Sequence, residues 1–163
     1  MKIKTLADYL EEIAPLSLQE DYDNSGLLVG NSNKEIGKAL ITLDVTEEIL
    51  SEAIDNQCDL VISHHPVIFR GIKKLIGNSL TERLIVKAIK ADIAIYAIHT
   101  NLDNSNWGVN AILGEKLGLK ELKVLSTKSA NLHKLVTFCP SEYAEKVRNA
   151  IFDAGAGHIG NYD

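Results

Sequence analysis

The feature that most constrains the fold is a regular alternation of short apolar runs with segments of helical period between residues 39 and 118. The runs at 39–45, 59–63 and 93–98 are short and rich in β-branched residues, which is typical of strands. Each run is followed by apolar residues recurring every three or four positions, as in an amphipathic helix. This β-α-β-α-β-α order predicts parallel strands joined by right-handed crossovers.

Residues with capping character mark the expected starts of several helices. Thr46 precedes one helical segment, and Ser79 with Glu82 has the spacing of a capping box before the next. Thr5 and Asp8 show the same spacing near the N-terminus, with Asp in place of Glu or Gln, and predict a helix that begins there.

A second unit is expected after a small, polar segment at 126–131, which is typical of a linker. A strand at Leu132–Cys139 and a helix capped by Ser141 would follow it. One strand and one helix cannot bury their apolar faces alone, so we expect the chain to end inside this module.

The predicted fold class is therefore α/β. We expect a three-layer α/β/α domain with a largely parallel or mixed sheet over 1–128, and the first part of another α/β module over 129–163.

Charge and cysteine content narrow the function classes. The formal net charge is −5, so the surface does not attract phosphate backbones non-specifically, and nucleic acid is not an expected partner. Cys58 and Cys139 form no CxxC pair and are interpreted as reduced, buried thiols of a cytoplasmic protein. No apolar run approaches the roughly 20 residues of a membrane span, and no export signal is visible.

Residues able to bind a metal follow two successive strands of the predicted sheet. His64 and His65 come directly after the second run, and His99 and Asp103 after the third, while Asp44 ends the first. Ligands in open parallel sheets bind beyond the carboxyl ends of the strands, and neighbouring strands lie about 4.8 Å apart. These side chains should therefore converge at one edge.

Imidazole and carboxylate ligands suit a divalent ion such as Zn²⁺, Fe²⁺ or Mn²⁺. In a tight turn before Pro66, His64 and His65 can diverge toward two ions about 3.5–4 Å apart, with Asp103 between them. No thiolate is offered nearby, which argues against a purely structural zinc site.

Each of these residues alone has an ordinary explanation. His64 and His65 could be solvated, and His99 could bond a backbone carbonyl. Asp103 could cap the next helix, and Asn104 or Ser105 could do the same. Their joint occurrence at successive strand ends favours the metal site.

Other candidates carry weaker signals. We interpret Trp107 as a packing anchor, with stacking on a nucleobase as the alternative, and His133 and His158 as unrelated to the site. Three cations after the histidine pair are interpreted as a solvated loop or as a contact for an anionic substrate: Arg70, Lys73 and Lys74.

The two motifs together resemble a known family. Ser63–Phe69 followed by Ile98–Asp103 is similar to the NIF-three-like proteins, dinuclear-metal-centre proteins often labelled GTP cyclohydrolase I type 2 homologues. The resemblance spans nearly all of residues 1–125 and also includes segments 23–27, 43–46, 108–110 and 117–119. Residues 134–138 and 155–163 resemble the start of a PII/CutA-like module inserted in longer members.

This resemblance implies a homohexameric ring with two divalent ions (Zn, Fe or Mn) per subunit. His64, His65 and Asp103 match metal ligands of the family, and His99 matches a residue in or next to the coordination shell, for which we expect catalytic proton transfer. The family takes a further His and Glu from a late helix, so the remaining ligands are expected beyond residue 163, and these residues alone are expected to be inactive.

The predicted function is a dinuclear metal-dependent hydrolase acting on a nucleotide or phosphoester, a small-molecule substrate. The alternative is a non-catalytic, ring-shaped metal-binding scaffold or regulator that binds partner proteins. No Walker-type glycine-rich loop is present. Ser63 stands where an Asp-His-His phosphoesterase would have aspartate, which argues against that class.

Overall fold

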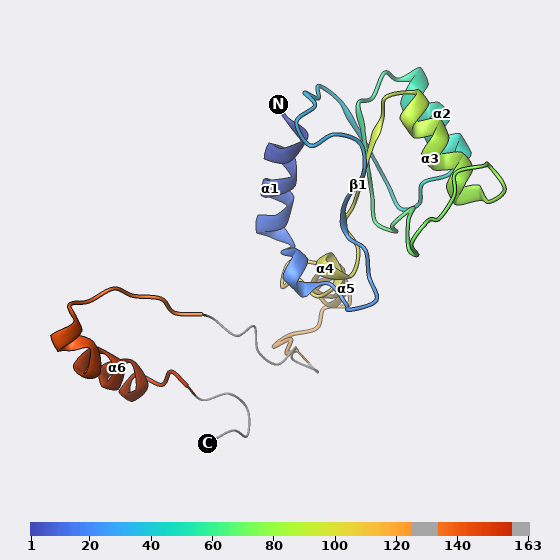
Figure 1. Ribbon diagram of the computed structural model, residues 1–163. Coiled ribbons are helices and arrows are strands. Elements are labelled where there is room, and N and C mark those ends of the chain that lie inside the picture. Colours follow the sequence, from blue (N-terminus) through green and yellow to red (C-terminus); the bar gives the residue numbers. More distant parts are fainter. Residues whose placement is uncertain (125–133, 158–163) are drawn as a thin grey trace. The chain divides into compact units, whose positions relative to one another are not determined.

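The computed structural model describes residues 1–124 and 134–157 (Figure 1). The chain divides into two compact units, Met1–Val124 and Leu125–Asp163. The candidate site residues named above, His64, His65, His99 and Asp103, lie in the first unit, and each unit is described by itself.

A four-stranded mixed sheet forms the middle of the first unit. Its strands are β1 (Gly26–Val29), β2 (Ala39–Thr42), β3 (Leu60–Ser63) and β4 (Ala94–Ala97). They lie in the order β1-β4-β3-β2, with β2, β3 and β4 parallel and β1 antiparallel to β4. The predicted parallel β-α-β arrangement is confirmed, and β3 and β4 are direct neighbours.

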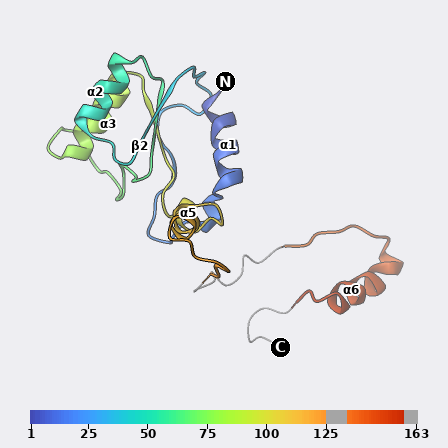
Figure 2. The ribbon, with the colours of Figure 1, turned by 180° about the vertical axis from the view of Figure 1, so that it is seen from behind.

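Helices cover both faces of this sheet and give the predicted three-layer α/β/α fold. The helix α1 (Ile3–Ile13) lies on one face, and α2 (Glu47–Asp55) and α3 (Leu80–Lys90) lie together on the other (Figures 1 and 2). Residues on successive positions of β3 alternate between the two cores, with Leu60 and Ile62 on the α1 side and Val61 on the α2–α3 side. Burial on both faces explains why β3 and β4 are continuously apolar.

Short helices continue from the site end of the sheet. The helix α4 (Thr100–Asp103) follows β4, and α5 (Val109–Lys116) comes next, while the 3-10 helix η1 (Leu16–Leu18) links α1 to β1. Figure 1 shows α4 and α5 at one end of the sheet, below α1.

Two of the three capping interactions predicted for the first unit are confirmed. The hydroxyl of Thr46 accepts from the backbone N–H of Ile49, and the hydroxyl of Ser79 accepts from that of Glu82, both at 3.2 Å. The box predicted at Thr5 is wrong, because α1 already begins at Ile3. The first N–H groups of α1 donate instead to backbone carbonyls of the 32–34 loop, so no capping side chain is needed.

The second unit contains the 3-10 helix η2 (Ser141–Tyr143) and α6 (Ala144–Asp153). The strand predicted at Leu132–Cys139 is not formed over 134–139, because the described part of this unit offers no strand to pair with it. Ser141 lies in η2 and does not cap α6. The predicted linker at 126–131, His133 and His158 lie outside the described residues. The PII/CutA-like assignment stays a prediction.

Burial of some side chains differs from the sequence interpretation. Cys58 is buried as expected, but Cys139 is exposed. Trp107 is 80% exposed and anchors no core within the described segments.

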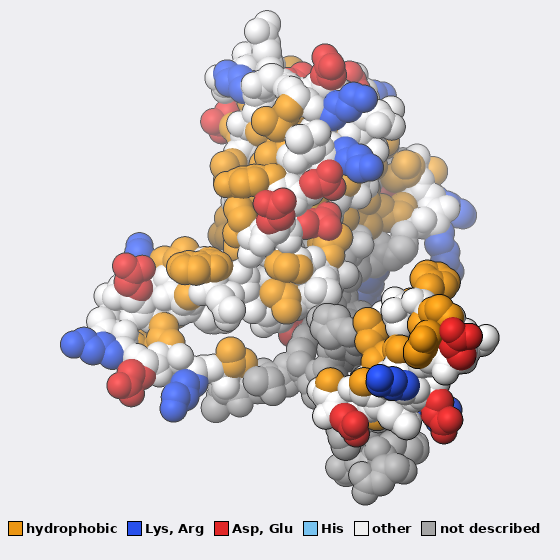
Figure 3. All heavy atoms as spheres, turned by 90° about the vertical axis from the view of Figure 1, so that its left-hand side faces the viewer, with side chains coloured by type: hydrophobic (Ala, Val, Ile, Leu, Met, Phe, Trp, Pro, Cys, Tyr) orange, Lys and Arg blue, Asp and Glu red, His pale blue; other side chains and the backbone are white. Residues whose placement is uncertain are grey.

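Figure 3 views the α1 side of the first unit, where hydrophobic side chains lie among charged ones. Tyr9 on α1 is 58% exposed. Over residues 1–124 and 134–157, no helix combines the length and hydropathy that crossing a membrane requires.

Gly108, which precedes α5, allows a close backbone approach that any side chain would block. A Cβ atom there would lie 1.6 Å from the carbonyl oxygen of Leu102. We expect Gly108→Ala to lower the free energy of unfolding by about 3 kcal/mol, measured by urea denaturation, because the α4–α5 junction must move. Gly71→Ala is the control, since a Cβ atom there meets nothing within 4 Å. Equal stability of the two variants would contradict this expectation.

Candidate metal centre

The tip of β3 presents two histidines in a turn fixed by its neighbour β2. The backbone N–H of His64 donates to the carbonyl of Thr42 at 3.1 Å, and that of His65 donates to the carbonyl of Leu43 at 2.9 Å. The hydroxyl of Ser63 donates to the carbonyl of His65 at 2.9 Å. Parallel pairing therefore continues past the strand end and holds both histidine backbones in place.

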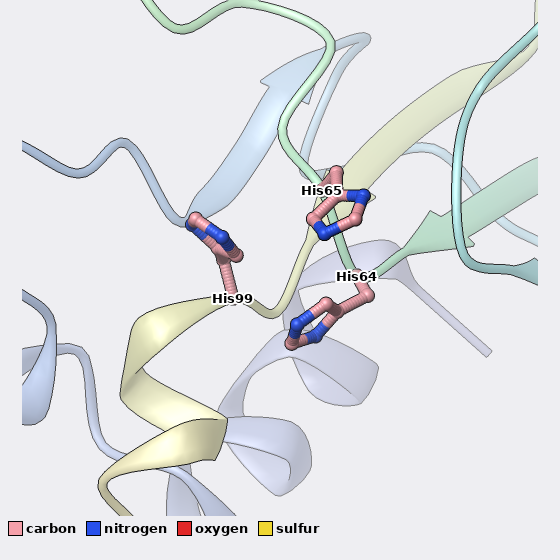
Figure 4. A group of neighbouring side chains, drawn as sticks. All are labelled: His64, His65 and His99. Atoms are coloured by element: carbon pink, nitrogen blue, oxygen red, sulfur yellow. The ribbon is translucent and has the colours of Figure 1, made fainter. Parts of the chain in front are cut away.

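Three imidazole rings converge at this edge of the sheet. Figure 4 shows His64 and His65 at the end of β3 and His99 at the start of α4, all around one space. Their ring centroids lie 5.0 to 5.5 Å apart. One ligand atom from each residue lies within 4.8 Å of the others. The structure thus brings together the histidines that the sequence placed at neighbouring strand ends.

Asp103 completes the group of candidate ligands. It lies at the end of α4, about one helical turn after His99, and its backbone N–H donates to the carbonyl of His99 at 3.1 Å. Its Oδ1 atom is 3.7 Å from Nε2 of His64. The short helix therefore returns the carboxylate to the same space as the imidazoles.

All three rings are held through their Nδ1 atoms. The acceptors are a backbone carbonyl and two carboxylates: Ile98 O to His64 at 2.9 Å, Asp44 Oδ1 to His65 at 2.7 Å, and Asp23 Oδ1 to His99 at 2.8 Å. An acceptor at Nδ1 requires the proton there, which leaves the Nε2 lone pair of each ring free for a metal. Metal-binding histidines are typically oriented by such partners.

Asp23 is the functional residue that the sequence analysis did not single out, because the run Asp23-Asn24-Ser25-Gly26 has the composition of an ordinary turn. Its side chain is fully buried and accepts bonds from His99 Nδ1, the backbone and hydroxyl of Thr100, the backbone of Asn24 and the hydroxyl of Ser25. Burial raises the pKa of Asp23, but the hydrogen bonds from His99, Thr100 and Asn24 outweigh it and hold the pKa at about 2. The carboxylate is therefore charged at neutral pH and fixes the ring of His99.

A buried polar network ties α4 to the segment around η1. The Asn101 amide donates to the carbonyl of Ala14 at 2.7 Å, and the Ser105 hydroxyl donates to that of Ile13 at 2.8 Å. Ser105 and Asn104 therefore do not cap α5, whose N-cap position is Gly108. The network holds α4, which carries Asp103 and follows His99, against the segment from the end of α1 to η1.

These donors fit a divalent metal. Ligands bound at about 2.1 Å lie about 3.4 Å apart on one tetrahedral ion and at most about 4.2 Å apart on any single ion. The 3.7 Å between His64 Nε2 and Asp103 Oδ1 suits a shared ion. The candidate ligand atoms of the three histidines lie up to 4.8 Å apart. This spacing suits one ion after a small inward shift of the rings, or a pair of adjacent ions.

The lowered pKa of Asp23 predicts a pH dependence for the metal-free protein. Above its ordinary value of 3.8 the carboxylate is charged in both states, so its native hydrogen bonds contribute fully. Between 3.8 and about 2 the unfolded chain binds the proton first, and this stability is lost as the pH falls. Urea midpoints from pH 5 to 2 should therefore fall more steeply for the native protein than for Asp23→Asn. Equal slopes would contradict the assignment.

Comparison with known proteins assigns the chain to a family. The model of the Duf34/NIF3 (NGG1p interacting factor 3) family matches residues 1–162. A GTP cyclohydrolase 1 type 2 homolog of Halalkalibacterium halodurans is 44% identical over 160 residues, covering 98% of this chain and 43% of that protein. A protein of the same name from Bacillus subtilis is 46% identical over 153 residues, covering 93% of this chain and 41% of that protein.

A solved structure agrees with the sequence comparison. The Bacillus cereus protein related to NIF3 superposes with a TM-score of 0.72 at 40% identity, covering 99% of this chain and 45% of that one. The chain thus spans less than half the length of these relatives. The resemblance noted in the sequence is confirmed, and the chain belongs to the Duf34/NIF3 family.

Proposed function

We propose that this edge of the sheet is a divalent-metal centre of a hydrolase. His64, His65 and Asp103 hold the metal, and His99 lies beside it. The observation that carries the proposal is that three imidazole rings surround one small space (Figure 4) and are all hydrogen-bonded through Nδ1, which leaves each Nε2 available to a metal. Two ions at this centre, with ligands from the rest of the protein, fit the spacing described above.

Divalent ions held by His64, His65 and Asp103 would supply an activated water and polarise a phosphoryl or ring-carbonyl oxygen. The residues of the chain supply the rest. Asp23 keeps the Nδ1 proton of His99 in place, so His99 accepts or returns a proton at Nε2. The proposed substrate is a nucleotide or another phosphoester, in keeping with relatives named GTP cyclohydrolase 1 type 2 homolog.

Turnover of a panel of nucleotides and phosphoesters by the metal-loaded, full-length protein tests this function. We expect His99→Ala to lower kcat by roughly 10²- to 10⁴-fold with metal content unchanged, because a proton-transfer group is lost. Loss of metal in that variant would instead make His99 a ligand. Full metal binding with no turnover of any substrate would contradict the hydrolase and favour the metal-binding scaffold. Assembly into a homohexamer stays a prediction from the family resemblance.

A further inference from the structure

Two exposed aromatic rings lie side by side next to the metal centre. The ring centroids of Tyr22 and Phe69 are 6.2 Å apart, with the ring planes tilted by 44°. Tyr22 is 65% exposed and Phe69 is 47% exposed. The rings come from loops more than 40 residues apart, one before β1 and one after β3. Such a pair offers an open apolar surface that neither loop provides alone.

The two loops are fixed to each other and to the metal centre. The side-chain amide of Asn24, two residues after Tyr22, donates at 2.7 Å to the carbonyl of Ile68, the residue before Phe69. Phe69 also meets His99 edge to face, with their centroids 6.4 Å apart. The rings therefore form a row from solvent to the candidate metal centre in the order Tyr22, Phe69, His99.

Three cations follow Phe69 within five residues of the chain. Arg70, Lys73 and Lys74 come after Phe69 in the loop between β3 and α3, and all three are exposed. None of them forms an ion pair or hydrogen bond with the residues that the structure describes. In a chain of net charge −5, this group of unpaired cations is suited to a mobile anionic ligand such as a phosphate.

We propose that Tyr22 and Phe69 form a stacking platform for the base of a mononucleotide, with Arg70, Lys73 and Lys74 neutralising its phosphate. The inference rests on the proposed function and decides between the two substrate classes left open there, in favour of nucleotides. Every base has a π face, and loss of an aromatic stacking partner weakens binding roughly 5- to 150-fold. A phosphoester without a base would gain nothing from these rings.

Isothermal titration of the Mn²⁺-treated protein with three probes tests the platform: GMP, AMP and ribose 5-phosphate. We expect both nucleotides to bind at least about tenfold more tightly than ribose 5-phosphate. The double variant Tyr22→Ala/Phe69→Ala should lose this preference while its affinity for ribose 5-phosphate stays unchanged. Tyr22→Phe should retain the preference, because it keeps the ring. Tyr9→Ala, which removes an exposed ring on α1, is the control and should also retain it.

The variants also separate the base from the phosphate. Lys73→Ala/Lys74→Ala should weaken all three probes by a similar factor. Equal affinity of the native protein for the three probes, or a nucleotide preference that survives the double aromatic substitution, would overturn the platform. Metal content is measured on the same samples and tests the proposed function separately. Absence of bound metal would contradict the proposed metal centre, whatever the affinities of the three probes.

Discussion

Replacing His65 with alanine is expected to lower the affinity of the protein for Zn²⁺ by more than about 100-fold while the protein stays folded. Loss of a residue that orients a metal ligand typically lowers metal affinity about 10- to 100-fold, and loss of the ligand itself should lower it further. His65 is the best histidine to change because its side chain is 47% exposed, against 19% for His64. Removing it leaves no large cavity, so a loss of metal would not reflect unfolding.

Competition with a chromophoric chelator measures this affinity, and circular dichroism verifies the fold. Asp44→Asn should show an intermediate loss, because it weakens only the contact that orients His65 through Nδ1. Asp55→Ala, an exposed carboxylate on α2, is the control and should bind like the native protein. Native-like affinity in His65→Ala would remove this residue from the centre.

Replacing Asp23 with alanine is expected to lower the free energy of unfolding by about 3 kcal/mol. The variant leaves the donors of His99, Thr100 and Asn24 without their buried acceptor. Each unsatisfied buried donor costs about 1–3 kcal/mol, with part recovered by local rearrangement. The same loss frees the ring of His99 and removes the hydrogen bonds between Asp23 and the start of α4.

Urea denaturation of the metal-free protein measures this loss without a contribution from bound metal. Asp21→Ala is the matched control in the same loop, because Asp21 is exposed and should change stability by no more than about 0.5 kcal/mol. If both variants unfold at the same urea concentration as the native protein, the buried carboxylate does not join the loop to α4.

The sequence allowed the fold and the candidate ligands to be predicted because both follow from local patterns. Apolar periodicity located β2, β3 and β4, and the parallel rule placed His64, His65 and His99 at one edge. The partners that orient these rings were harder to predict from the sequence. Asp23 lies 76 residues from His99, and nothing in its turn-like surroundings signals a buried carboxylate.

Other differences arise where tertiary contacts replace local signals. The first N–H groups of α1 donate to carbonyls of the 32–34 loop. The capping pattern at Thr5 therefore does not mark the start of the helix. The strand predicted before Pro140 lacks a pairing partner in the described second unit. The Tyr22–Phe69 pair joins two loops, and no local pattern relates residues so far apart in the chain.

Anomalous diffraction at the zinc edge, from crystals grown with Zn²⁺, tests the central claim most directly. We predict an anomalous peak about 2.1 Å from Nε2 of His64 or His65, with Asp103 as a further ligand and the Nδ1 contacts to Ile98 and Asp44 retained. No peak within bonding distance of these three side chains, or coordination through Nδ1 with those contacts broken, would contradict it.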